Sequence, residues 1–392
     1  MRILLCHQPT DGGVGRHIRD LVEGLSAEGH EVILCSPERP SGLAQGVDHV
    51  PLDLRRAIAP RDDLAALARF VRIARSVRPD VIHAHSSKAG AVVRLAKLFS
   101  PRLPVVYTPH GYAFAGYFSR SAERSAYRAV ERALAPLASR VVCVCAAEAR
   151  LARSVGPDSR VRVVHNGIDP AGEGSVDGRV AELSGRGPVL GALTMLRPGK
   201  GLQTLIAALP GVLAEHPSAQ LAIVGDGPDL GELTAQAQAA GVRHAVHFLG
   251  PSDDPLGALR GMDVFVHPSW AESFPYVILE AMSLARPIVA SDVGGIGEAI
   301  LDGESGLLTT PRDEHSLARA LTEMLGSPRL AEQLGDAARR RVLSEFTTTA
   351  MIAGLLGVYE EALRGPGSLA TTRPPAAPAP HPAEHDVRGD RC

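Results

Sequence analysis

The sequence predicts an α/β protein made of two doubly wound parallel-sheet domains that follow one another along the chain. Short runs of almost wholly apolar residues alternate with longer segments of helical periodicity in both halves. Continuous apolar strands separated by helices are typical of a parallel sheet that helices cover on both faces. The chain has 392 residues, which is too long for one ordinary core and favours two domains.

The first half supplies the elements of one such domain, which we place at residues 1–171. Its predicted strands are the apolar runs at 3–6, 31–35, 81–84, 105–108, 141–145 and 161–165. Its predicted helices, taken from the spacing of their apolar residues, are 17–28, 64–76, 90–99 and 122–137.

The second half repeats this alternation, and we place a second domain at residues 188–346. Its predicted strands are 189–193, 220–224, 246–249, 264–267 and 287–290. Its predicted helices are 202–215, 229–240, 275–284 and 316–325.

Three further segments complete the chain. Five glycines in a polar stretch indicate a linker at 172–187. Residues 347–364 form a last predicted helix, which we expect to cross back to the first domain. Residues 365–392 are rich in Pro and Ala, and we expect this tail to be disordered because it cannot bury enough apolar surface.

Composition limits the partners and the compartment. The formal net charge is −2, so no overall field favours nucleic acid as a partner. Five cysteines without paired spacing do not predict a disulfide framework. Met1 leads almost directly into a strand, and no run of about 18 apolar residues occurs. We therefore expect a cytoplasmic protein without a signal peptide or a membrane span.

Open parallel sheets bind ligands at the carboxyl ends of their strands, so the loops there are the places to search. After the first strand, a glycine-rich turn containing Gly13 opens a helix, which suits either an anion or simply a tight turn. After the first strand of the second domain, Arg197 and Lys200 stand beside a helix start at Gly201. They suit a diphosphate, and the alternative is a solvated basic loop.

Two glutamates follow the predicted strand at 264–267. Glu272 lies in a loop, and Ser273 with Pro275 forms a predicted helix N-terminus just after it. Glu280 falls in the second turn of that helix among apolar residues, where a carboxylate needs a partner. A structural ion pair and a ligand hydroxyl are the two alternatives.

Glu272 and Glu280 together resemble the Glu-x7-Glu motif of retaining glycosyltransferases with the GT-B fold, particularly glycosyltransferase family 4. Further matching motifs occur in order along residues 1–363. They begin at Gly12-Gly13, His83-Ala84-His85, Pro109-His110-Gly111, His165-Asn166-Gly167, Lys200-Gly201, Gly225-Asp226-Gly227-Pro228, Phe248-Leu249-Gly250, Asp292-Val293-Gly294-Gly295 and Asp302-Gly303. The resemblance implies two Rossmann-like domains facing each other across a cleft that holds the site.

The resemblance also implies how a nucleotide-sugar donor is held. Glu280 would bind the ribose hydroxyls, and Glu272 would contact hydroxyls of the transferred sugar. Backbone groups of Ser273, Phe274 and Pro275 would hold the distal phosphate.

The remaining implied roles concern the diphosphate and the sugar. Arg197 and Lys200 would neutralise the departing diphosphate, Gly13 would approach it from the first domain, and His110 would lie beside the donor sugar. Three positions depart from the family pattern: the usual arginine position is Met195, Ser273 replaces a glycine, and Ala146 replaces a serine or threonine.

The function implied is a retaining hexosyl transfer from a nucleotide-diphosphate sugar, with a UDP-sugar favoured, to a lipid-linked glycan, a polysaccharide or a small molecule. No cofactor is expected. The sequence contains no Asp-x-Asp, so we expect no metal on the diphosphate. Two alternatives remain: a sugar-nucleotide 2-epimerase of the same fold, and a non-catalytic partner that binds the donor.

One predicted helix carries an arginine at every fourth position, and we call this set the arginine strip. It consists of Arg120, Arg124, Arg128 and Arg132. The strip is either a solvated face with local pairs to Glu123 and Glu131, or a cationic surface for an anionic membrane or a diphosphate-linked lipid acceptor. The second alternative would place the protein peripherally on the inner face of the membrane.

Overall fold

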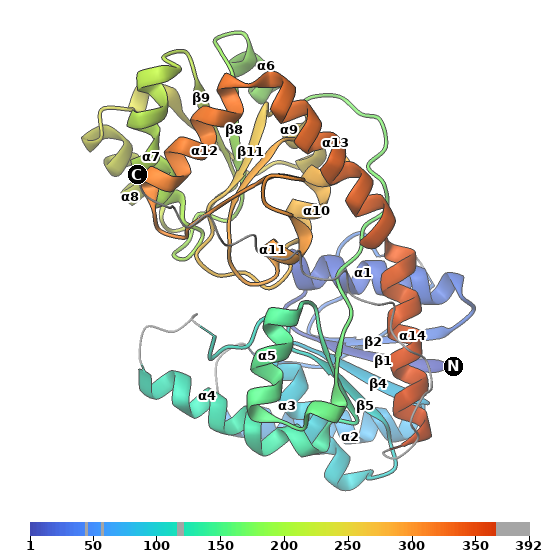
Figure 1. Ribbon diagram of the computed structural model, residues 1–392. Coiled ribbons are helices and arrows are strands. Elements are labelled where there is room, and N and C mark those ends of the chain that lie inside the picture. Colours follow the sequence, from blue (N-terminus) through green and yellow to red (C-terminus); the bar gives the residue numbers. More distant parts are fainter. Residues whose placement is uncertain (44–45, 56–58, 116–120, 366–392) are drawn as a thin grey trace, which may run out of the picture.

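The computed structural model describes residues 1–43, 46–55, 59–115 and 121–365. It contains two sheets, one of seven and one of six strands, and every pairing between their strands is parallel. The two sheets lie in separate lobes, drawn at the bottom and top of Figure 1. The α/β class with two doubly wound domains is therefore confirmed.

The first sheet has the strand order β3-β2-β1-β4-β5-β6-β7. Its strands are β1 (Arg2–His7), β2 (Glu31–Ser36), β3 (Asp48–Pro51), β4 (Val81–His85), β5 (Val105–Thr108), β6 (Arg140–Cys143) and β7 (Val161–Val163). The α-helices of this part are α1 (Gly12–Ala27), α2 (Pro60–Val77), α3 (Ser87–Ala96), α4 (Ser121–Leu134) and α5 (Ala146–Val155). The order reverses direction between β1 and β4, which is the switch point at which such sheets bind ligands.

The second sheet has the order β10-β9-β8-β11-β12-β13. Its strands are β8 (Val189–Leu193), β9 (Gln220–Val224), β10 (Val246–Gly250), β11 (Val264–His267), β12 (Ile288–Ser291) and β13 (Leu307–Thr309). The helices that follow β7 are α6 (Gly178–Ser184), α7 (Leu202–Glu215), α8 (Leu230–Ala239), α9 (Pro255–Arg260), α10 (Tyr276–Ser283), α11 (Ile296–Ala299), α12 (Glu314–Gly326), α13 (Pro328–Glu345) and α14 (Thr348–Arg364). Its switch point lies between β8 and β11.

Each sheet is buried on both faces, as continuous apolar strands require. Successive residues of β1, such as Ile3 and Leu4, belong to different apolar clusters on the two sides of the first sheet. Leu190 and Val189 divide in the same way between the two clusters of the second sheet. Both switch points are therefore supported by packed cores on either side.

The final helix α14 packs on the first domain rather than the second. Met351, Ile352 and Leu355 join the apolar cluster formed by β1 and α1. The Tyr359 hydroxyl and His83 Nδ1 form a buried hydrogen bond of 2.7 Å. In Figure 1 this helix runs down the side of the lower lobe, so the described part of the chain ends on the domain where it began.

The structure corrects several boundaries. The expected linker 172–187 is not wholly irregular, because Gly178–Ser184 forms α6, which packs on β8 and β9. The helix after Glu272 begins at Tyr276 with Pro275 as its N-cap and no side-chain cap, so Ser273 does not cap it. The predicted tail 365–392 lies outside the described residues from position 366 onward.

Candidate active site

A cavity of about 300 Å³ opens between the two domains at the carboxyl ends of their strands. The first domain lines it with the loop after β5, including Gly111 and Tyr112, and with the start of α5. The second domain lines it with the loop 270–273 and with Gly294. Residues from both halves therefore meet at one site, and the described Glu272 and Ser273 lie directly on its wall.

Glu272 is held in a charged, nearly buried pair. Lys200 Nζ donates to Glu272 Oε1 at 2.6 Å, and His267 Nε2 lies 3.2 Å from the same oxygen. Burial by itself would raise the pKa of Glu272, but the His267 hydrogen bond and the Lys200 charge outweigh it and hold this pKa well below its usual range. Glu272 is therefore ionised at neutral pH, and its second oxygen remains for other donors.

The loop that carries Arg197 and Lys200 is pressed against the Glu272 loop. Gly201 has a φ of 71°, and a Cβ at this position would collide with the carbonyl of Pro268. Trp270 N donates to Gly199 O at 2.8 Å, which joins the two loops. Glycine at 201 thus permits the contact that places Lys200 on Glu272.

Arg197 belongs to the same turn as Lys200, whose backbone N–H donates to the Arg197 carbonyl at 3.3 Å. Its Nε is buried and has no hydrogen-bond partner in the described part of the chain, and no ion pair to it is formed there. Met195, at the usual arginine position of the family pattern, is 57% exposed. The loop 197–200 therefore carries one paired cation, Lys200, and one cation, Arg197, that has no partner among the described residues.

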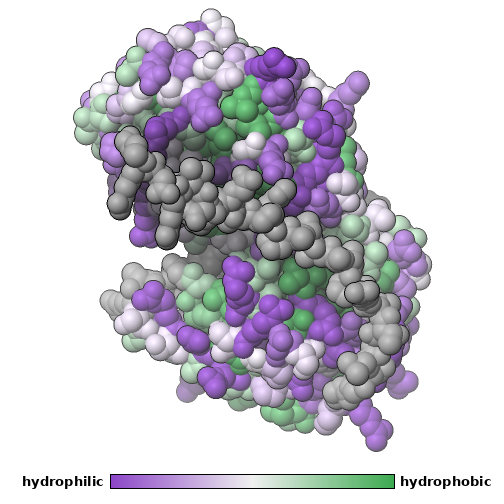
Figure 2. Space-filling model, in the orientation of Figure 1, coloured by the Kyte–Doolittle hydropathy of each residue, from purple (hydrophilic) through white to green (hydrophobic). Residues whose placement is uncertain are grey.

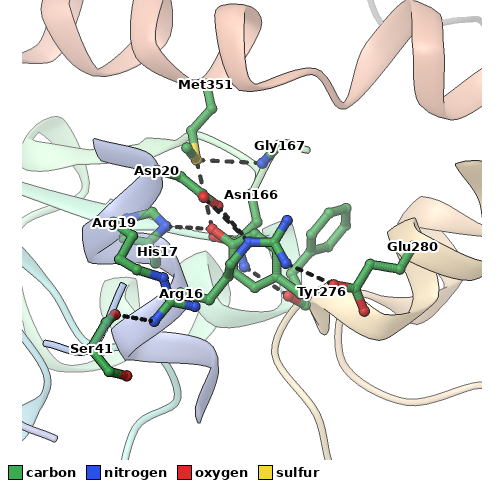
Figure 3. A network of polar contacts seen from close by, with 11 residues as sticks. Arg16, His17, Arg19, Asp20, Ser41, Asn166, Gly167, Tyr276, Glu280 and Met351 are labelled. Atoms are coloured by element: carbon green, nitrogen blue, oxygen red, sulfur yellow. Dashed lines mark hydrogen bonds and ion pairs between the residues drawn. The ribbon is translucent and has the colours of Figure 1, made fainter. Parts of the chain in front are cut away.

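Glu280 reaches across to the first domain. Arg16 Nη1 of α1 donates to Glu280 Oε1 at 2.8 Å, and Arg16 also contacts Asp20 Oδ2 at 3.1 Å. Figure 3 shows Arg16 lying between these two carboxylates and beside Tyr276. The ion-pair alternative for Glu280 is thus realised in this structure, and the ribose role of Glu280 stays a prediction.

His110 follows β5 in a left-handed backbone conformation with a φ of 52°. Its Nε2 lies 3.0 Å from Nδ1 of His85, the last residue of β4. The ring of His17 packs edge-on against the ring of His110 at a centroid distance of 4.6 Å. Burial is the largest cause that lowers the pKa of all three imidazoles, and they are therefore neutral at pH 7.

These three histidines also form a group with metal-ligand spacing. One ring nitrogen from each of His17, His85 and His110 lies within 4.8 Å of the others. No spacing in the sequence indicates such a group, because the three residues come from α1, β4 and the loop after β5.

Known proteins resemble both halves of the chain. Residues 11–171 match the family described as Glycosyltransferase Family 4, and residues 179–341 match the family described as Glycosyl transferases group 1. A glycogen synthase of Mycobacterium tuberculosis is 30% identical over 390 residues, which cover 90% of this chain and 92% of that protein. The chain belongs to glycosyltransferase family 4.

Other relatives of this glycosyltransferase carry related names. A phosphatidyl-myo-inositol mannosyltransferase of Mycolicibacterium smegmatis is 30% identical over 377 residues, covering 92% of this chain and 94% of that protein. A D-inositol 3-phosphate glycosyltransferase of Acidothermus cellulolyticus is 30% identical over 401 residues, covering 92% and 88%. None of these names is that of an epimerase, so the epimerase alternative is not supported.

Solved structures show the same fold. Anabaena HepE in complex with UDP superimposes with a TM-score of 0.77 and 23% identity, covering 92% of this chain and all of that one. Sucrose-phosphate synthase from Thermosynechococcus elongatus gives 0.76 and 23%, covering 93% and 99%. These likenesses confirm the GT-B fold that the sequence motifs implied.

Further interdomain contacts in the glycosyltransferase surround the cleft. His17 Nδ1 lies 2.9 Å from the hydroxyl of Tyr276, and Asn166 Nδ2 donates to the carbonyl of Phe274 at 2.8 Å. Glu298 of α11 accepts hydrogen bonds from the amides of Ala146 and Ala147 at 2.8 and 3.1 Å. A residue of the second domain therefore caps helix α5 of the first domain. The observed N-cap of α5 is Cys145, and the next residue, Ala146, occupies the position at which the family pattern has a serine or threonine.

Glu148 is a site residue that the sequence interpretation missed. Its carboxylate accepts from the amides of Val144 and Gly111, and it lines the cavity. Burial raises the pKa of Glu148 to about 7. The signal was present, because Cys145 and Glu148 have the spacing of a capping box with Cys in place of Ser.

Gly13 lies in the first turn of α1, and a Cβ built there would meet no atom within 4 Å. The backbone at the start of α1 is therefore open to an approaching group. Phe274, by contrast, is 3% exposed and contributes its side chain to the core. Only its backbone is available to a ligand.

Three arginines of the arginine strip lie on the exposed face of α4, and Arg120 lies outside the described residues. Arg124, Arg128 and Arg132 form no ion pair with any residue the structure describes. The expected pair with Glu131 is wrong, because Glu131 is buried and accepts from Arg94 at 2.8 Å and from the Tyr107 hydroxyl at 3.1 Å.

The described helices are not suited to crossing a membrane. None of the helices in the described ranges combines the length and the hydrophobicity that a span requires. On the face drawn in Figure 2, hydrophobic areas are small and separated by hydrophilic side chains.

Proposed function

We propose that this family 4 enzyme is a retaining, metal-independent hexosyltransferase that uses a UDP-sugar donor. The observation that carries the proposal is the Lys200–Glu272 pair, whose Glu272 lines a cavity shared by both domains, together with Arg197 in the same loop as Lys200 and without a partner among the described residues. Two fixed cations beside an ionised carboxylate suit a sugar diphosphate, because the diphosphate takes the cations and the sugar hydroxyls donate to the carboxylate.

The remaining groups arrange the donor along α10. Glu280 accepts from the ribose hydroxyls, which requires Arg16 to release at least one of its oxygens. The backbone of Ser273, Phe274 and Pro275 at the start of α10 holds the distal phosphate. Gly13 approaches the diphosphate from the first domain, and His110 lies beside the sugar.

The chemistry follows from the charges. The bond between the anomeric carbon and the distal phosphate oxygen breaks, and its electron pair leaves with UDP. The acceptor oxygen forms its bond on the same face of the sugar, and its proton passes to the departing phosphate oxygen. Lys200 and Arg197 stabilise the negative charge as it develops, which is electrostatic preorganisation. These cations take the part that a metal plays elsewhere, and the sequence lacks the Asp-x-Asp that would hold one.

The relatives support the donor and acceptor classes. The Anabaena structure is described as a complex with UDP, and the mycobacterial relatives are named for glycogen and for phosphatidyl-myo-inositol. We infer a glycan, lipid-linked or small-molecule acceptor in the cavity next to Glu148 and Tyr112.

The test is the stereochemistry of product or of hydrolysed donor. Purified protein is incubated with UDP-hexoses in excess EDTA, and the anomer formed first is read by NMR. We expect the donor's own configuration and full activity in EDTA. An inverted anomer would overturn the retaining mechanism, and loss of activity restored by Mg²⁺ would overturn metal independence.

We further propose that the arginine strip contacts an anionic membrane. Arg124, Arg128 and Arg132 are exposed and unpaired by any described residue, and each cation contributes about 1 kcal/mol near an anionic surface. Successive positions drift by about 40° around the helix, so the strip arginines share only part of one face.

A vesicle assay tests this contact. Wild type should co-float with anionic vesicles at low salt and be released by raised salt, because the attraction is screened. Replacing Arg120, Arg124, Arg128 and Arg132 by Gln should abolish flotation and spare donor hydrolysis. Wild type that remains with the soluble fraction at low salt would overturn the proposal.

A further inference from the structure

Three imidazoles converge at the cleft side of the first domain, each from a different element. His17 belongs to α1, His85 ends β4, and His110 follows β5. One ring nitrogen of each lies within 4.8 Å of the other two. We propose that these three histidines form a binding site for a divalent transition-metal ion of the zinc class, and that the bound ion excludes the donor sugar.

The site has free ligand atoms. Nε2 of His17 has no hydrogen-bond partner among the described residues, although its side chain is 3% exposed, and Nδ1 of His85 and Nε2 of His110 have only each other there. A buried nitrogen without a partner is costly, and a ligand would satisfy it. The neighbouring His83 differs, because Tyr359 and Thr108 engage both of its nitrogens.

The donor set selects the class of ion. The described cluster contains imidazoles alone, which suit Zn²⁺, Ni²⁺ and Cu²⁺, whereas Mg²⁺ and Ca²⁺ prefer oxygen. Zinc binds imidazole nitrogen at about 2.0–2.1 Å, so tetrahedral ligand nitrogens lie about 3.4 Å apart. His85 Nδ1 and His110 Nε2 are already 3.0 Å apart, and the ring nitrogen of His17, which lies within 4.8 Å of the ligand atoms of both, has to move closer to complete the site. A fourth position then remains for water, as in open zinc sites.

The local charge does not oppose a cation. Arg16 precedes His17, but Asp20 and Glu280 pair with its guanidinium. Figure 3 shows Arg16 between these carboxylates, with His17 next to it in α1.

The consequence for the enzyme rests on the proposed function. His110 is assigned to the donor sugar, so an ion on His110 removes that contact and occupies its place. Zinc should therefore compete with the UDP-sugar, and a chelator should restore donor binding.

The experiment measures zinc binding directly, without turnover. The tail contains His381, His385 and Cys392, which can bind zinc by themselves, so all titrations use the full chain with these three replaced by Gln, Gln and Ser. Equilibrium dialysis should give one zinc per chain. His17→Gln and His85→Gln should each weaken binding by about tenfold or more, since even outer-shell partners commonly contribute 10–100-fold.

The matched control is His244→Gln, which removes an exposed histidine and should leave zinc affinity unchanged. Circular dichroism without metal verifies that each variant folds. If one variant fails to fold, the other variant still tests the site. The absorption spectrum of Co²⁺ bound to the intact cluster is a further test, because nitrogen ligands give visible d–d bands without a thiolate charge-transfer band. No stoichiometric binding, a thiolate band, or equal affinity in the cluster variants would overturn the site.

Donor competition separates this proposal from the proposed function. The dissociation constant of the UDP-sugar is measured with and without saturating zinc. A rise with zinc supports exclusion of the donor. An unchanged donor constant with zinc on the cluster would leave the metal site standing and would remove His110 from the donor site.

Discussion

The buried ionisable groups on the two sides of the cleft have opposite charge states: they are neutral on one side and ionised on the other. On the first-domain side, His17, His85 and His110 are neutral, because burial lowers their pKa and no acid among the described residues pairs with them. On the second-domain side, Glu272 is also buried but stays ionised, because His267 and Lys200 are its partners and lower its pKa. Burial alone therefore does not set the ionisation of a group, because the available partner can outweigh it.

This contrast divides the proposed work. Fixed charges on the second domain suit the diphosphate, whose charge grows during transfer, whereas neutral imidazoles suit sugar hydroxyls.

The largest expected effect follows loss of the charge on Lys200. Lys200→Ala should lower turnover by about a hundredfold or more, as removal of one preorganised electrostatic group commonly does. Initial rates at saturating donor measure it. The control, Lys97→Ala, removes a lysine that contacts Ser139 outside the cleft, and its turnover should stay at the wild-type level. Unchanged turnover in Lys200→Ala would assign the charge to Arg197.

Acid should weaken the imidazole side. The pKa of His17 is lowered to about 4 by burial, and an unfolded histidine has about 6.5, so the unfolded chain binds more protons between these values. The stabilisation is complete above pH 6.5 and is lost as pH falls. Between pH 6.5 and 5 the loss is about 1.5 kcal/mol for this one group.

The measurement compares variants, because other groups titrate in the same window. The pKa of Asp20 is raised to about 6 and that of Glu148 to about 7, mainly by burial, and both changes oppose the histidines. His17→Gln should reduce the loss of unfolding free energy between pH 6.5 and 5 by about 1.5 kcal/mol relative to wild type. His244→Gln should leave it unaltered. Parallel curves for wild type and His17→Gln would contradict the assignment.

The sequence predicted the sheets better than their edges. Central strands such as β1 and β8 are continuous apolar runs, so periodicity found them. The edge strand β3 was missed because Asp48–Pro51 is polar and only partly buried. The site was predicted on the second domain, where Lys200, Glu272 and Glu280 lie in recognisable local motifs.

Contacts between the domains were beyond the sequence. Arg16 and Glu280 are 264 residues apart, and nothing in local spacing pairs them. The same holds for the three converging histidines and for the hydrogen bond that Glu298 of α11 accepts from the first turn of α5. Such contacts depend on how two independent sheets face each other, which periodicity does not encode.

Glu280 sits on the boundary between the two sides, and two variants separate its roles. If it binds the ribose, Glu280→Ala should raise the donor dissociation constant about tenfold or more, since hydrogen bonds to charged groups contribute about 1.5–3 kcal/mol. Arg16→Ala should then bind donor no more weakly than wild type, because it frees the carboxylate. Isothermal titration with donor measures both. Equal weakening by the two variants would reduce Glu280 to an interdomain ion pair.

The smallest effect concerns Glu298, which joins the two sides by capping α5. Loss of an N-cap acceptor costs about 1 kcal/mol, and Glu298→Ala should lower the free energy of unfolding at pH 7 by that amount. The exposed Glu304 of the same domain is the control, and Glu304→Ala should stay within about 0.5 kcal/mol of wild type.

Glycine at 295 allows this cap to form, because a Cβ there would press on Cys145 and Phe274. Burial would raise the pKa of Glu298, but His165 and the two amides outweigh it and lower this pKa. The stabilisation by Glu298 is therefore present above about pH 4.5 and is lost as pH falls through the lowered value. The difference between wild type and Glu298→Ala should be constant from pH 8 to pH 6 and vanish in strong acid. A difference that persists there would mean that packing, not the charged cap, holds α11 against α5.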